Sequence, residues 1–90
     1  MGVREELVEH FGDDLLFADS FDNAIIGVSI GTDSRRVVYD TGQMVEILVQ
    51  EESFTEETAW EFLEFNTFCA YVGEQTPIYV TKVDNNVRTI

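Results

Sequence analysis

Residues 55–77 read TEETAWEFLEFNTFCAYVGEQTP, and this stretch decides the predicted fold. Thr55 supplies the hydroxyl of a helix N-cap, and acidic residues fill the turn after it, where the helix dipole favours negative charge. The helix that begins at residue 56 either stops near Asn66 or continues to Val72. Gly73 suits the left-handed position that ends many helices, so we favour continuation, with a bend inside the helix. Pro77 then marks the loop that leads to the next element.

The predicted helix has two unlike faces. Its apolar face carries one amide among hydrophobic residues at helical spacing: Ala59, Phe62, Leu63 and Asn66. Its opposite face carries Glu57, Glu61 and Glu64, with Trp60 at the edge. Residues three and four apart are neighbours on a helix surface, so these three carboxylates line up over about 10 Å.

The flanking segments supply the other elements. Apolar residues at helical spacing indicate helices, and alternating β-branched residues indicate strands. Asp40 precedes one helical pattern as a good N-cap. The expected elements are helix 3–11 with a second short turn at 15–18, strands 24–30 and 35–39 joined as a hairpin, helix 41–50, and strand 78–83.

The order of these elements is α-β-β-α-α-β, which predicts an α+β fold. We expect one domain over residues 1–90, with a sheet of about three strands, antiparallel or mixed, and helices packed on one face of the sheet. Residues 1–18 are expected to form an N-terminal helical segment, and residues 84–90 a loose tail.

The charge balance is the outlying feature of the composition. Eighteen acids and five bases give a net charge of −13. Such a chain is repelled by bare nucleic acid and by anionic lipid, so neither is expected as a direct partner. An acidic host proteome is the alternative explanation for the charge.

The single cysteine, Cys69, excludes an intrachain disulfide and fits a reducing, intracellular setting. Its apolar neighbours predict that it packs in the core. No apolar run has the length of a membrane span, and the N-terminus lacks the layout of a signal peptide.

No motif predicts chemistry. The lone His10 and Cys69 give too few ligands for a zinc site. The aspartates near residues 13–22 do not match calcium-loop spacing, and the glycines form no phosphate-binding fingerprint. We therefore expect no enzyme, no catalytic residue, no metal and no cofactor.

A long stretch of the chain that is rich in acids and lacks basic residues could form an interaction surface. The 45 residues between Arg36 and Lys82 contain nine acids and neither Lys nor Arg. Such a face can occupy the positively charged nucleic-acid groove of another protein, with Trp60 as an aromatic anchor. The expected partner-binding residues are Glu51, Glu52, Glu56, Glu57, Trp60, Glu61 and Glu64. The alternative is a solvated face whose like charges are merely tolerated, because each like-charge pair costs only tenths of a kcal/mol.

Asn66 allows a second site hypothesis. A polar residue on an apolar helix face needs partners, and its amide either ties down the following loop or contacts a ligand. In the second case a small-molecule pocket between the sheet and the helix would include Asn66, Tyr71 and Gln75.

The stretch from Phe21 to Val80, about two thirds of the chain, resembles a family of small phage-encoded proteins of undefined function. The segments that carry the resemblance are FDNAIIGV at 21–28, VVYD at 37–40, VEIL at 45–48, TEETAWEFLEFN at 55–66 and AYVGEQTPIYV at 70–80. The resemblance implies a phage gene product that works in the cytoplasm of a bacterial host.

These observations lead to three hypotheses of different classes. The first is a non-enzymatic phage protein that binds and inhibits a basic host protein by nucleic-acid mimicry. Its target would be a CRISPR effector or another defence nuclease, or else a transcription factor or polymerase. The second is a small-molecule sponge or minor enzyme with its pocket between the sheet and the central helix. The third is a phage structural or assembly protein that forms a homo-oligomer.

Overall fold

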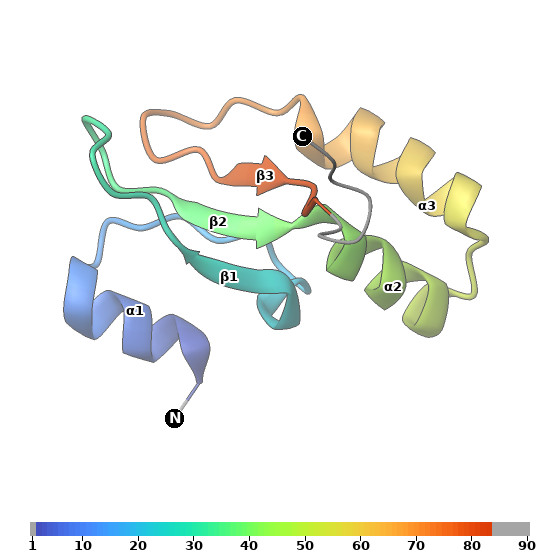
Figure 1. Ribbon diagram of the computed structural model, residues 1–90, viewed down its shortest axis with the longest axis horizontal. Helices are drawn as coiled ribbons and strands as arrows, with labels where there is room; N and C mark the ends of the chain where they lie inside the picture. Colours follow the sequence, from blue (N-terminus) through green and yellow to red (C-terminus); the bar gives the residue numbers. More distant parts are fainter. Residues whose placement is uncertain (1, 84–90) are drawn as a thin grey trace, which may run out of the picture.

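The computed structural model describes residues 2–83 and contains a three-stranded mixed sheet (Figure 1). Its strands are β1 (Ile25–Val28), β2 (Val37–Asp40) and β3 (Ile78–Val80), in the order β1-β2-β3. β1 runs antiparallel to β2, and β3 runs parallel to it. The predicted α+β fold with a sheet of three strands is confirmed.

Three α-helices accompany the sheet: α1 (Val3–Phe11), α2 (Thr41–Glu52) and α3 (Glu56–Leu63). A short 3₁₀ turn, η1 (Asp22–Ala24), precedes β1, and a π turn, η2 (Glu64–Phe68), follows α3 directly. The predicted order of the main elements is correct. The helical turn predicted at residues 15–18 is absent, because the segment after Gly12 is irregular. The tail predicted at 84–90 lies outside the described residues.

The hairpin between β1 and β2 contains one irregularity. Ile25 pairs with Tyr39 and Gly27 with Val38, so Ile26 is the extra residue of a β-bulge. The side chain of Ile26 is 45% exposed. Because the bulge adds one residue to β1 alone, Ile25 and Gly27 pair with the consecutive residues Tyr39 and Val38 of β2.

The crossover from β2 to β3 brings α2 and α3 to one end of the sheet (Figure 1). β2 leads into α2 without a loop, because Asp40 is both its last residue and the N-cap of the helix. The Asp40 carboxylate accepts a hydrogen bond of 3.0 Å from the backbone N–H of Gly42, as the capping pattern predicts. The chain returns through α3, η2 and a loop to lie beside β2.

The hydrophobic core lies against one face of β2. Val37 and Tyr39 alternate onto this face, and both are fully buried. They belong to one cluster with buried side chains from both helices of the crossover and from the segment before β1: Leu15, Phe21, Ala24, Met44, Val45, Leu48, Ala59 and Leu63. Side chains of α2 and α3 therefore share one core with β2.

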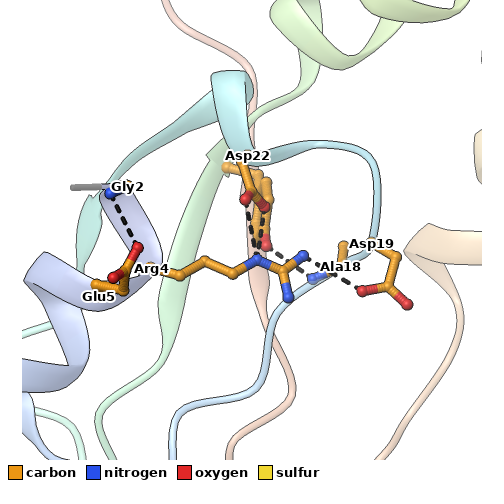
Figure 2. Close-up of polar contacts among 7 residues, drawn as sticks. Gly2, Arg4, Glu5, Ala18, Asp19 and Asp22 are labelled. Carbon is orange, nitrogen blue, oxygen red and sulfur yellow. Dashed lines mark hydrogen bonds and ion pairs between the residues drawn. The ribbon is translucent and has the colours of Figure 1, made fainter.

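α1 contacts the rest of the domain through Leu7 and Phe11, which pack against the core, and through Arg4. The Nε atom of Arg4 donates to both carboxylate oxygens of Asp22, at 2.8 and 3.0 Å, and its Nη2 lies 3.3 Å from Asp19 Oδ1 (Figure 2). The guanidinium also lies 4.9 Å from the centre of the Phe17 ring. The hydrogen bond to Asp22 raises the pKa of Arg4. No residue of α1 is fully buried, so its contacts with the domain are these half-buried side chains and the ion pairs of Arg4.

The helix predicted over 56–72 is shorter in the structure. Regular α-helix ends at Leu63, and the π turn carries the chain only to Phe68. Gly73 has a positive φ of 119°, but it lies in a separate turn that Thr76 closes with a 3.1 Å backbone hydrogen bond. The prediction that Gly73 adopts a left-handed conformation is confirmed, and the prediction that it ends the helix is wrong.

The two tyrosines of the paired strands predict a loss of stability at high pH. Burial raises the pKa of both Tyr39 and Tyr79 above 10.0. The unfolded chain therefore releases these protons at lower pH than the folded one, so the free energy of unfolding falls as pH rises above about 10. Urea unfolding at a series of pH values measures this fall.

Tyr79→Phe serves as the control for this prediction. It removes one of the two groups, so the alkaline decrease in stability should become smaller. An equal decrease in the variant and in the natural chain would contradict the assignment.

Candidate functional site

The acidic residues predicted to bind a partner gather along α3 and around the turn before it. Glu56, Glu57 and Glu61 lie on α3, and Glu64 opens the π turn. Glu51 and Glu52 occupy the last turn of α2. All six carboxylates are exposed, and we call them the acidic surface.

The core fixes which way this surface faces. Ala59 and Leu63 are fully buried, so the side of α3 that carries Glu57 and Glu61 points away from the protein. The helix starts at a fixed point because the Thr55 hydroxyl accepts a 3.1 Å hydrogen bond from the Thr58 N–H. The acids are thereby presented on a rigid element.

The ion pairs formed within the described residues do not involve the acidic surface. Within residues 2–83, Arg4 pairs with Asp19 and Asp22, and Lys82 lies 3.6 Å from Asp40. None of these pairs includes a carboxylate of the acidic surface. Its like charges are therefore balanced by solvent ions rather than by described side chains.

Trp60 lies at the edge of the acidic surface and is half-buried. Its ring meets the edge of Phe68 at a centroid distance of 5.9 Å, and Phe68 lies 5.0 Å from Tyr79. Tyr79 in turn lies 5.7 Å from the buried Tyr39. Trp60 thus ends a row of aromatic rings that joins α3 to the sheet, which leaves only part of the indole for a partner.

Asn66 is exposed, contrary to the prediction that it lies on the buried face. Its amide donates a 2.9 Å hydrogen bond to the carbonyl of Phe62, one turn earlier rather than in the following loop. The π turn causes the difference, because it changes the helical register after Leu63 and rotates later side chains away from the predicted face.

The alternative small-molecule pocket is not assembled as predicted. Asn66 lines a hollow beside residues 16–21, whereas Tyr71 lines another hollow beside the hairpin tip. Gln75 is half-buried in the loop after Tyr71 and lines neither hollow. The three residues therefore do not converge on one cavity.

The structure contains an exposed apolar surface that the sequence did not predict. Phe65 is 87% exposed, Val72 is 59% exposed and Phe62 is 41% exposed. They lie on α3, in the π turn and in the loop after it. The only signal in the sequence was the density of aromatic residues after Trp60. Helical spacing placed Phe62 on the buried face, which is wrong, and it assigned neither Phe65 nor Val72 to the core.

Cys69 is also exposed, so the prediction that it packs in the core was wrong. It directly follows the π turn, where the chain has left the buried stripe of α3. Residues 2–83 contain no group of three or more His, Cys, Asp or Glu side chains placed to hold a metal ion. No helix in this range is both long and apolar enough to cross a membrane.

Comparison of the chain with protein-family models, with curated proteins and with solved structures finds no match.

Proposed function

We propose that this domain is a non-enzymatic binding protein whose acidic surface occupies the nucleic-acid site of a basic partner protein. The observation that carries the proposal is the exposure of six glutamates on α2, α3 and the start of the π turn, outside every ion pair formed within residues 2–83. Because the backbone that carries these carboxylates is already helical, binding has to order only their side chains.

The net charge of −13 supports the same proposal, because it steers a basic protein toward the domain and repels nucleic acid itself. Together with the resemblance to phage proteins, this points to a phage product that inhibits a nucleic-acid-binding protein of the bacterial host. A defence nuclease in the host cytoplasm is the target class that such an inhibitor would serve best.

Reversal of Glu57, Glu61 and Glu64 to lysine tests the proposal. Immobilised domain is used to capture proteins from a bacterial lysate, at low and at high salt, with and without added duplex DNA. The natural domain should retain basic proteins that duplex DNA and salt both release. The triple reversal should weaken their binding at least about a hundredfold, since like charges then face each other.

A matched control changes the net charge equally at a distant place. Glu6, Glu9 and Asp13 are exposed on and just after α1, far from α3 in Figure 1. Their reversal to lysine should leave capture unchanged. If the α1 reversal weakens capture as much as the α3 reversal, net charge rather than the acidic surface is responsible and the proposal fails.

A further inference from the structure

Two hollows in the surface share lining residues in the segment before η1. One, of about 450 Å³, lies between residues 16–21 and the segment from Asn66 to Val72. The other, of about 310 Å³, lies between the end of α2 and Phe62. Both are lined by Asp19 and Phe21, so they are neighbouring hollows, and we treat them together as one depression.

The floor of this depression is hydrophobic. We call it the apolar groove and define it by Leu16, Phe21, Phe54, Phe62, Ala70 and Val72. Leu16 is 38% exposed and Val72 is 59% exposed, while Phe62 stacks at a tilt on Phe54 with ring centres 5.7 Å apart. Exposed apolar side chains beside open hollows are typical of protein-binding surfaces.

The rim of the groove is acidic. Glu51 and Glu52 border the smaller hollow, and Asp19 borders both. Asp19 shares its charge with Arg4 at 3.3 Å, but its side chain is 93% exposed and remains open to a second cation. Glu51 and Glu52 also belong to the acidic surface, so the groove and that surface are continuous through the end of α2.

The charge of the rim selects the occupant. A second copy of this chain would bring another net charge of −13 against the same carboxylates, and an anionic membrane would be repelled in the same way. A segment with apolar side chains and flanking Lys or Arg would satisfy both floor and rim, because long basic side chains lay their methylenes on apolar surface and keep their charges at the edge.

We propose that the apolar groove binds an amphipathic, basic segment of the partner, with its apolar side chains in the hollows and its cations on Asp19, Glu51 and Glu52. This inference rests on the proposed function and adds to it the site that holds the partner's apolar side chains. The acidic surface supplies attraction and speed of association, and the groove supplies the buried contact that slows dissociation.

A labelled peptide of leucine and lysine, with leucine at helical spacing, is a suitable probe. A second peptide has the same composition, but its leucines are spread so that no apolar face forms. Fluorescence anisotropy should show that the natural domain binds the patterned peptide about tenfold or more tightly than the scrambled one.

Two variants change the groove in opposite ways. Phe62→Ser removes part of its floor, and Ala70→Trp fills the larger hollow without deleting a contact. Each should lower affinity for the patterned peptide about tenfold, to the level of the scrambled one, and leave affinity for the scrambled peptide unchanged. Ile30→Ser is the control, since Ile30 is 71% exposed and lies beyond β1.

The possible failures can be told apart. If both peptides bind equally and the groove variants have no effect, the groove is not an anchor, although the acidic surface can still bind cations. If neither peptide binds and the Glu57, Glu61 and Glu64 reversal changes nothing, the proposed function fails as well. If the domain self-associates in sedimentation equilibrium and Ala70→Trp abolishes this, the occupant is a second copy and the inference is overturned.

Discussion

Replacing Tyr39 with alanine is expected to remove most of the stability of the domain. The side chain is fully buried on the central strand of the sheet, and its hydroxyl accepts a 2.7 Å hydrogen bond from the Ala18 N–H. Loss of a buried aromatic ring costs about 3–5 kcal/mol, and the N–H left without a partner costs about 1–3 kcal/mol more. A domain of this length has roughly 5–13 kcal/mol in total.

Urea denaturation of Tyr39→Ala and Tyr71→Ala measures this effect with the same chemical change at two sites. Tyr71 is 77% exposed, so its removal should alter the free energy of unfolding by no more than about 0.5 kcal/mol. Equal losses at the two sites would mean that Tyr39 is not the centre of the core.

Leu63→Ala is the second substitution with a large expected effect. Leu63 is the last residue of α3, is fully buried, and belongs to the cluster that joins this helix to α2 and the sheet. Replacement of buried leucine by alanine leaves a cavity and costs about 2–5 kcal/mol. The π turn begins directly after this residue, so the same change should also loosen the turn and increase amide hydrogen exchange in residues 64–68.

Phe65→Ala provides the comparison two residues later in the same stretch. Phe65 is 87% exposed, so its loss should change stability by about 0.5 kcal/mol or less despite the larger side chain. A larger loss for Phe65→Ala than for Leu63→Ala would reverse the assignment of faces in α3 and the π turn.

Local signals predicted much of the fold. Asp40 and Thr55 are good N-cap residues, and both accept the backbone hydrogen bond that begins a helix. The alternating β-branched residues before and after Gly31 correctly predicted an antiparallel hairpin. These features depend on neighbours within a few residues, so the sequence contains the information needed to place them.

Other features depend on contacts that the local pattern does not record. An α-helical spacing continues through Phe62, Leu63 and Asn66, but the π turn after Leu63 breaks that spacing and leaves Asn66 exposed. Nothing near β3 indicated that it would pair parallel to β2, because this pairing is set by the path of the crossover.

In the candidate site, too, some features follow from the local pattern and others depend on distant contacts. Helical spacing placed Glu57 and Glu61 opposite the buried Ala59, so their exposure followed from the pattern. The apolar groove combines residues 16–21 with residues 47–72, which are distant in sequence, and neither segment predicts a groove alone. Only the folded chain brings its floor and its acidic rim together.

The parallel pairing of β3 with β2 also has a consequence for synthesis of the chain. The hairpin and α2 are complete once about residue 52 has been made, but β3 lies at residues 78–80. During translation, one edge of β2 therefore has no strand beside it until the rest of the crossover has left the ribosome. An unpaired edge is prone to pair with other chains, so the nascent protein is most vulnerable to aggregation in this interval.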